Sequence, residues 1–245
     1  MTTLYGWGPM FGVQSPSPFV AKADIQMQMF DIPCHRATAD LESVSKGKAP
    51  YVEDDGRIIE DSTFIRLHFE QKLGVDLDEG LDTQQRATAW AIERMLEDRL
   101  TPIIVHERWV EGDNFARGPA MFFMGVPEPM RAEVANGVRE AVRANLHSQG
   151  IGRHSREERM QLARRDIDAA AVLLGDKPFM MGSYPTAVDA AVYGVIAACT
   201  APVFDSPLKE IVASHANLVA FLKRMEDRFY TEERWPSMMP ETEAA

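Results

Sequence analysis

Two serines stand directly before the first helix signal of the chain. Ser15 and Ser17 come just ahead of Pro18, and proline is common in the first turn of a helix because its missing N–H would be unpaired there. A hydroxyl group and the free N–H groups of a helix start, together with the helix dipole, can stabilise an anion such as a thiolate. Ser17 is equally suited to be an ordinary N-cap, and both interpretations stay open.

A second polar pair, Asp61 and Ser62, precedes another helix signal over residues 63–73. A carboxylate at such a place can bind an ammonium group, and a hydroxyl with free helix N–H groups can hold a carboxylate. Lys48, and less directly Lys46, could attract a further carboxylate. The alternatives are a simple helix cap and solvated lysines.

Other reactive side chains form no recognisable motif. The two cysteines, Cys34 and Cys199, are far apart and make no C-x-x-C pattern, so we expect reduced thiols and no disulfide framework. His106 begins an H-E-R-W segment that lacks the second histidine of a zinc helix. The remaining histidines are scattered, and no metal site is expected.

Composition narrows the functional classes. The chain has 245 residues, 45% hydrophobic and 26% charged, with a net charge of −11, which is typical of a globular protein. The acidic balance argues against a nucleic-acid partner and against anionic lipid. The uncharged segment 190–204 has 15 residues, short of the roughly 20 that span a membrane. Residues 1–11 show no secretory signal, and we expect a cytoplasmic protein.

The first part of the chain reads as a small α/β unit. A β-prone run at 3–7 is followed by a helix from Pro18, a strand at 34–39, and two short runs flanking Asp54-Asp55-Gly56 that indicate a hairpin. The helix over 63–73 is closed by Gly74. We place this unit at residues 1–76, with the linker at 75–81.

The second part, residues 82–236, is predicted to be all helical. Ala89, Ile92, Leu96, Leu100 and Ile103 follow a helical spacing, as do apolar residues over 160–174. Thr186-Ala-Val-Asp189 is typical of a capping box, and another helix is expected at 216–229. Residues 112–129, rich in glycine and proline, are predicted to form a loop or break, and 237–245 a flexible tail.

Several motifs, taken in order, resemble a known family. S-P-F-V-A-K at Ser17–Lys22, K-A-P-Y-V with G-R-I-I-E-D-S, and T-A-V-D resemble the glutathione transferase fold: a thioredoxin-like α/β domain followed by an all-α domain. G-x-G-R-H-S-R-E-E, L-G-D-K-P-F and P-T-A-V-D-A resemble the failed-axon-connections branch, which is related to metaxins.

The resemblance implies a glutathione site with specific residues. It implies that Ser17, or its competitor Ser15, activates the thiol of glutathione. The long first loop, residues 8–16, departs from the short loop of many family members and puts the identity of that hydroxyl in doubt. The rest of the tripeptide would be bound by the residues Lys48, Ala49, Pro50, Asp61 and Ser62, with Pro50 in a cis peptide and the Ala49 backbone pairing with the cysteinyl part.

The function so implied is a Ser-type glutathione S-transferase that attacks a small electrophile, with a role in detoxification and homodimers as in many family members. An aromatic and methionine-rich wall for the second substrate would come from Trp7, Met10, Phe11 and Trp109, since such side chains make adaptable apolar surfaces. Core packing is the alternative role for them. The alternative function is a non-catalytic binding or scaffold protein of the metaxin kind.

Overall fold

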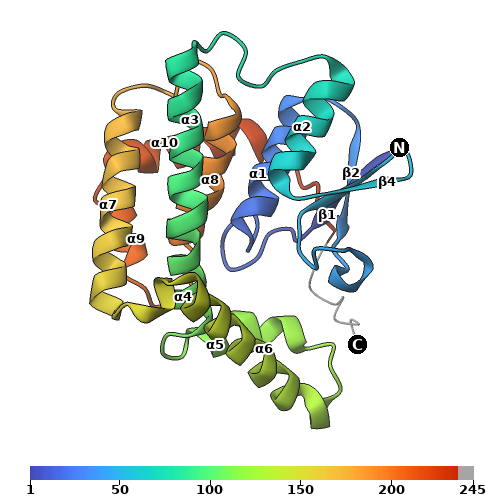
Figure 1. The fold of residues 1–245 in the computed structure, drawn as a ribbon, viewed down its shortest axis with the longest axis vertical. Coiled ribbons are helices and arrows are strands. Elements are labelled where there is room, and N and C mark those ends of the chain that lie inside the picture. Colours follow the sequence, from blue (N-terminus) through green and yellow to red (C-terminus); the bar gives the residue numbers. More distant parts are fainter. Residues whose placement is uncertain (237–245) are drawn as a thin grey trace.

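The computed structural model describes residues 1–236, and its first part is a four-stranded sheet with two helices (Figure 1). The strand order is β2-β1-β3-β4, with β1 parallel to β2 and the other pairs antiparallel. The elements are β1 (Thr2–Gly6), α1 (Pro18–Met29), β2 (Cys34–Thr38), the 3₁₀ turn η1 (Leu41–Ser43), β3 (Tyr51–Asp54), β4 (Arg57–Glu60) and α2 (Ser62–Leu73). The predicted α/β fold class is confirmed.

Local sequence explains the ends of these elements. The β3–β4 hairpin turns at Asp55 and Gly56, both at positive φ, which aspartate and glycine tolerate best. Gly74 adopts the left-handed conformation that ends α2, as its position after Leu73 predicts. Leu4, Met27, Val52 and Phe69 bury their side chains between the sheet and the helices.

The second part is helical throughout the described residues, and the predicted class is again confirmed (Figure 1). Its elements are α3 (Thr83–Met95), the π-helical turn η2 (Leu96–Leu100), α4 (Thr101–Trp109), α5 (Asn114–Arg117), η3 (Pro119–Phe123), α6 (Glu128–Gln149), η4 (Ile151–Arg153), α7 (Arg156–Leu174), α8 (Ala187–Cys199), α9 (Leu208–Ala213) and α10 (Ala216–Phe229). None of the helices among residues 1–236 is long and apolar enough to cross a membrane.

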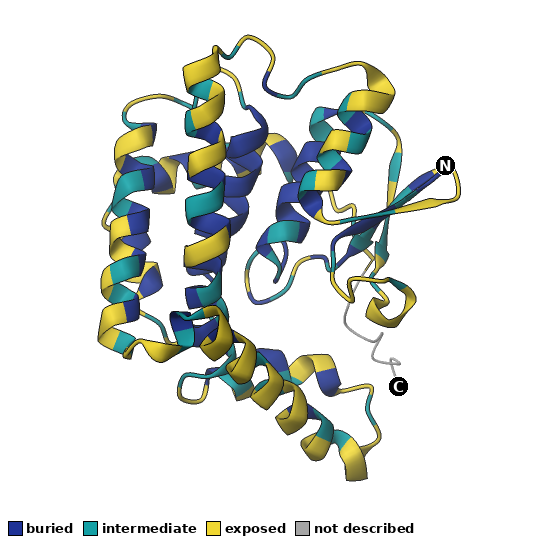
Figure 2. Ribbon diagram, viewed as in Figure 1, coloured by how far each residue is buried: buried dark blue, intermediate teal, exposed yellow. Residues whose placement is uncertain are grey.

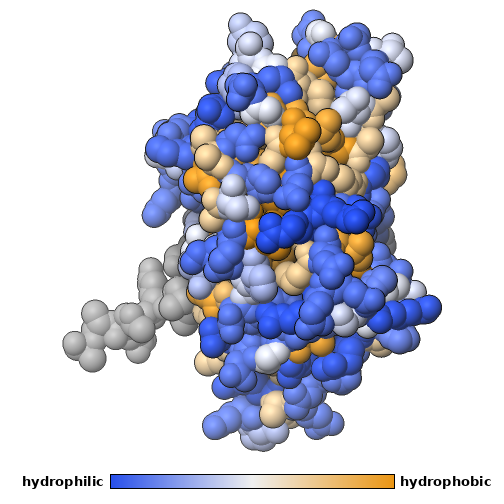
Figure 3. Space-filling model, turned by 90° about the vertical axis from the view of Figure 1, so that its left-hand side faces the viewer, coloured by the Kyte–Doolittle hydropathy of each residue, from blue (hydrophilic) through white to orange (hydrophobic). Residues whose placement is uncertain are grey.

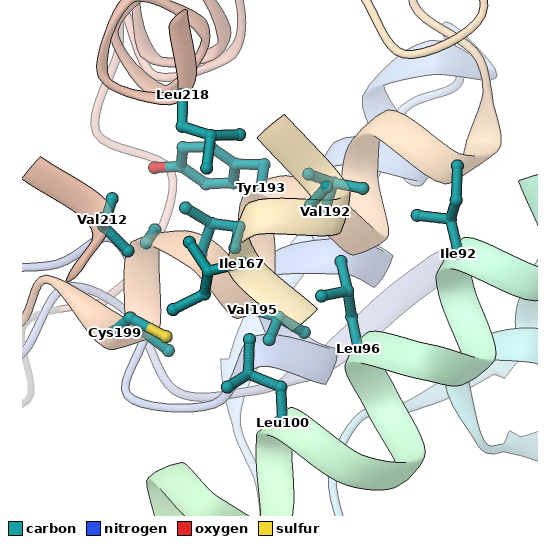
Figure 4. Close-up of a cluster of buried hydrophobic side chains, with 14 of the residues drawn as sticks. Ile92, Leu96, Leu100, Ile167, Val192, Tyr193, Val195, Cys199, Val212 and Leu218 are labelled. Carbon is teal, nitrogen blue, oxygen red and sulfur yellow. The ribbon is translucent and has the colours of Figure 1, made fainter. Parts of the chain in front are cut away.

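The core of this part surrounds α8, which is buried along its whole length. On the side of the molecule that lies at the left of Figure 1, the surface is mostly hydrophilic, with scattered apolar patches (Figure 3). Figure 4 shows Leu96 and Leu100 from the η2 turn, together with Ile167 of α7, pointing toward Val195 and its neighbours on α8. The helical spacing read from Ala89 to Ile103 therefore marks buried positions.

Helix α1 lies between the two parts and is buried on both sides (Figure 2). It lies directly against α8, where a Cβ built on Gly194 would come within 2.3 Å of the Pro18 carbonyl oxygen. Lys22 and Gln26, which an isolated amphipathic helix would expose, are therefore buried. The hydrophobic spacing of α1 predicts only one buried face, because the second face is buried by the helical part of the fold.

The segments between and after the helices do more than connect. Asp78 in the linker is buried and accepts hydrogen bonds from the backbone N–H of Ala187 and from Arg66. Near the C-terminus, the Trp235 side chain contacts the sheet unit at Gly6 and Gly8 and donates its indole N–H to Asp24. The tail predicted at 237–245 lies outside the described residues.

The region 112–129 is more ordered than its glycine and proline content predicts. It contains the short elements α5 and η3, and it leads into α6, a helix of 22 residues that the sequence reading did not identify. Helix α6 buries only Ala135 and Leu146. Its first two residues lie inside the glycine- and proline-rich stretch that predicted a loop, and the helix therefore went unidentified.

Candidate active site

A cavity of about 250 Å³ opens between the sheet unit and α3. It is lined by Lys46, Lys48, Ala49, Pro50, Asp61, Ser62 and Thr63 from one side, by Phe19 of α1, and by Arg94, Glu97 and Asp98 from the other. All the residues predicted to hold the body of a glutathione molecule thus share one wall. We call this space the polar cavity.

The Ala49–Pro50 peptide bond is cis, as the resemblance predicted. It lies immediately before β3, and the Pro50 carbonyl accepts a long bond of 3.4 Å from the Asp61 N–H. The turn before β3 is therefore tied to the start of α2. Ala49 and Pro50 reach the cavity together with the helix start because of this connection.

The start of α2 combines a cap with a polar surface. The Asp61 carboxylate accepts a hydrogen bond from the Thr63 N–H at 2.9 Å, so the predicted helix cap is confirmed. Asp61 is exposed and has a φ of 84°, while Ser62 beside it is buried. The Asp61 carboxylate and the first residues of α2 therefore line the same cavity.

The two lysines at the cavity differ in their partners. Lys46 is held by its own chain: its backbone N–H donates to the Glu60 carboxylate at 2.7 Å, and its ammonium lies 4.9 Å from the Phe64 ring centre. Lys48 is exposed and has no ion-pair partner among residues 1–236. Lys48 is the cation that remains available to a carboxylate ligand.

Ser17 caps α1 as the sequence indicates. Its hydroxyl accepts from the Val20 N–H at 3.4 Å, and its own N–H donates to the Ser15 hydroxyl at 3.2 Å. Ser15 is buried, whereas Ser17 is partly exposed. Both hydroxyls therefore stand at the start of α1, but neither serine is among the residues that line the polar cavity, which α1 reaches at Phe19.

The sequence reading missed the acidic and basic residues that α3 and the π turn bring to the cavity. The ammonium of Lys22, 1% exposed, binds Glu93 at 2.9 Å and Glu97 at 2.8 Å. Arg94 binds the same two carboxylates. Burial raises the pKa of Glu97. In the sequence, Glu93 and Glu97 stand out as charged residues next to the apolar positions of this helix. That pattern does not show that their partner is Lys22 of α1.

The residues predicted to hold a second substrate converge around Phe122, which the sequence reading did not name. Its ring centre lies 6.1 Å from that of Trp7, 5.9 Å from that of Phe11 and 6.4 Å from that of Trp109. We call Phe122 and these three rings, Trp7, Phe11 and Trp109, the aromatic group. Met10 has no part in these ring contacts; together with Phe11 it lines another cavity of about 830 Å³, bordered by the 230–236 segment.

Neither Cys34 nor Cys199 is among the residues that line the polar cavity. Burial raises the pKa of the Cys34 thiol and raises that of Cys199 to about 12, and both are unpaired. The structure places Cys199 in the helical core (Figure 4). Within residues 1–236, no group of His, Cys, Asp and Glu side chains has the arrangement of a metal site.

A thioredoxin-like sheet with a cis-proline, joined to an all-helical part through a shared α1–α8 contact, defines the glutathione transferase class of fold. The chain belongs to this family. Residues 18–114 match the glutathione S-transferase N-terminal domain and residues 163–225 the glutathione S-transferase C-terminal domain.

Individual relatives include both enzymes and proteins of other kinds. The isoprene-epoxide–glutathione S-transferase of Rhodococcus sp. (strain AD45) is 30% identical over 241 residues, covering 94% of this chain and 99% of that one. Failed axon connections of Drosophila melanogaster is 25% identical, over 89% of this chain and 55% of that one. Metaxin-2 of Homo sapiens is 23% identical, over 84% and 80%.

Solved structures agree on the fold. A glutathione S-transferase from Methylobacterium radiotolerans, determined in complex with glutathione sulfonate, superposes with a TM-score of 0.62 at 17% identity, over 98% of this chain and 97% of that one. The resemblance to this family and to its failed-axon-connections and metaxin relatives is thereby confirmed.

Proposed function

We propose that this protein is a Ser-type glutathione S-transferase, which binds glutathione in the polar cavity and transfers its thiolate to a small electrophile. The observation that carries the proposal is the convergence of Lys48, Ala49, cis-Pro50, Asp61 and Ser62 on one cavity beside the start of α1. The Rhodococcus relative and the glutathione sulfonate complex support the same ligand.

Each part of the tripeptide has a matching group. Asp61 binds the γ-glutamyl ammonium, and Ser62 with the α2 N–H groups holds its carboxylate. The Ala49 backbone pairs with the cysteinyl unit, and Lys48 attracts the glycyl carboxylate. Over the roughly 8 Å of a physiological Debye length, Lys48 matters more locally than the net charge of −11.

The chemistry begins with transfer of the thiol proton to water. A free thiol has a pKa of about 8.5, and lowering it by about 2 units needs roughly 2.7 kcal/mol of preferential thiolate stabilisation. A hydrogen bond from the Ser17 hydroxyl and the dipole of α1 supply stabilisation of that order. The thiolate then forms a C–S bond while a halide leaves or an epoxide C–O bond breaks, the alkoxide taking a proton from water.

The electrophile is expected to be small and apolar, because the aromatic group borders the first loop. The name of the Rhodococcus relative makes an isoprene-type epoxide a reasonable first substrate to assay. We propose a role in detoxification on the same basis, and a cytoplasmic location because both cysteines are unpaired, as is usual in reducing compartments. We also propose a homodimer, supported by exposed apolar side chains on β4, α2 and α3: Ile58, Phe64, Leu67 and Trp90.

The test compares two helix caps. Ser17→Ala and Ser155→Ala each remove a hydroxyl that accepts from a helix N–H, and each is expected to cost about 1 kcal/mol of stability. Only Ser17→Ala should raise the pKa of bound glutathione and lower conjugation to a nitroaromatic halide or epoxide, by about 100-fold. Absence of wild-type turnover above background would contradict the proposal.

The second candidate is a non-catalytic binding or scaffold protein, favoured by the metaxin and failed-axon-connections relatives and by the long first loop. A ligand of the native state must raise the melting temperature. Failure of millimolar glutathione to raise it would favour this function.

A further inference from the structure

A buried arginine of the helical part is bonded to the loop that carries Ser17. Arg108 of α4 is 6% exposed, and its guanidinium donates to the Pro16 carbonyl at 2.6 Å and to the Ala198 carbonyl at 2.7 Å. The Pro16 carbonyl belongs to the peptide unit that contains the nitrogen of Ser17. Because the guanidinium fork is planar and rigid, these bonds fix the Ser17 backbone relative to α4 and α8.

The same guanidinium has no carboxylate partner within residues 1–236. The neighbouring Glu107 is bound by Arg156 at 2.8 Å. The Cys199 thiol is neutral at pH 7, since burial raises its pKa to about 12. Burial also lowers the pKa of Arg108 to about 10, so the side chain stays charged at neutral pH.

Burial of the Arg108 charge without a carboxylate partner lowers the stability of the folded protein. The Nε atom of Arg108 is buried without a partner, and the Phe204 ring covers the guanidinium at 4.9 Å. An unpaired buried charge is normally selected against. Two backbone bonds could be made by a neutral side chain, so the retained positive charge calls for another explanation.

We propose that Arg108 is a positioning residue for the glutathione thiol: it fixes Ser17 through the Pro16 carbonyl, and it places a positive charge without a carboxylate partner against the loop that carries Ser17. The inference rests on the proposed function. A carboxylate partner would cancel this charge, which explains why none is present. The other charges that face the bound tripeptide line the polar cavity: Lys46, Lys48, Asp61, Arg94, Glu97 and Asp98.

The test measures the pKa of glutathione bound to the folded protein, from the ultraviolet absorbance of its thiolate. Arg108→Met removes the charge and both donors, and it is expected to raise the thiol pKa by about one pH unit. The kcat at pH 7 should fall about tenfold, with little change in the KM for glutathione. Arg108→Lys, which keeps the charge, should restore most of the wild-type pKa.

A matched control separates this role from a structural one. Arg159 is another buried arginine of the helical part, bonded to Glu111 and to the His154 carbonyl. Arg159→Met should lower the melting temperature and leave the thiol pKa unchanged. If Arg108→Met does not fold, Arg108→Gln, which removes the desolvated charge and keeps a donor, is expected to show the same rise in thiol pKa.

The outcomes are distinguishable. A wild-type protein that binds glutathione, with an unchanged thiol pKa in the folded neutral variants, would overturn the role of Arg108 and leave the proposed function standing. A wild-type protein that does not bind glutathione would overturn both. A pKa rise in Arg159→Met equal to that of the Arg108 variants would also contradict the inference.

Discussion

The polar cavity and the aromatic group differ in what fills them. The polar cavity is open, with an available cation at Lys48 and a helix start at Ser62. The centre of the aromatic group holds the chain's own Phe122. Under the proposed function, glutathione would enter an open polar space, whereas an apolar electrophile would share its space with a side chain of the protein.

The supports of the two regions also differ. Beside the polar cavity lies a buried ion cluster of Lys22, Glu93 and Glu97, in which each charge is stabilised by its partners. The aromatic group rests on ring contacts and on the segment 119–123, where Phe122 is 38% exposed. Losing one ion should therefore damage the molecule more than losing one ring.

The largest expected effect is that of Lys22→Met. It leaves two buried carboxylates without their cation from α1, and a broken buried ion pair costs about 3–5 kcal/mol. Urea unfolding measures this loss. The triple variant Lys22→Met/Glu93→Gln/Glu97→Gln should recover most of the stability, and a loss below about 1 kcal/mol in the single variant would show that Lys22 is not a support.

The next effect concerns acid stability on the α4 side. Burial lowers the pKa of His106 from 6.5 to about 4, so the unfolded chain takes up a proton before the folded one does. The stabilisation from neutral His106 is complete above pH 6.5 and is lost as the pH falls toward 4. The Glu111 carboxylate 3.3 Å from the His106 ring favours the charged form and offsets part of this stabilisation, so we expect about 2 kcal/mol. His106→Gln should flatten this part of the urea-derived stability profile, and an identical profile would contradict the assignment.

The third prediction concerns glutathione binding in the polar cavity. Asp61→Asn keeps a capping oxygen and tolerates the positive φ, but it removes the charge that faces the γ-glutamyl ammonium. The Kd for glutathione in calorimetry should rise about tenfold, as expected for a lost charged hydrogen bond. Asp82→Asn, which changes the N-cap of α3, should leave the Kd unchanged; equal effects would place the ligand elsewhere.

The smallest effect is expected from opening the aromatic group. Phe122→Ala should cost about 1 kcal/mol, because the ring is only partly buried. The KM for a bulky apolar electrophile should change about threefold, while the Kd for glutathione stays constant. Met124→Ala, in the same segment and 63% exposed, serves as the control. If Phe122→Ala changed the Kd for glutathione, the polar cavity and the aromatic group would have to be treated as one site.

Much of the fold was predictable because its signals are local. The Asp55-Gly56 turn, the Gly74 helix end and the Asp61 and Thr186 caps each depend on a few adjacent residues. Helix α6 was missed because it begins inside the glycine- and proline-rich stretch 112–129 and has no side-chain cap to mark its start. The short elements within 112–129 were hidden by their glycine and proline content.

The candidate site divides in the same way. Motif resemblance located Pro50, Asp61 and Ser62, and the structure brings them together. Glu97, Phe122 and Arg108 could not be identified, because each is recognised by a partner from a distant segment: Lys22 of α1, the rings of Trp7 and Trp109, and the Pro16 carbonyl.

By itself the sequence determined the two-part architecture, the helix caps and the serines and carboxylate that begin α1 and α2, because caps, turns and hydrophobic spacing are encoded within a few residues. Only the tertiary structure decided that Lys22 is buried, that Phe122 fills the aromatic group and that Arg108 reaches the Ser17 loop. These outcomes depend on α1 being enclosed by both parts, and burial is a property of the assembled fold rather than of any one segment.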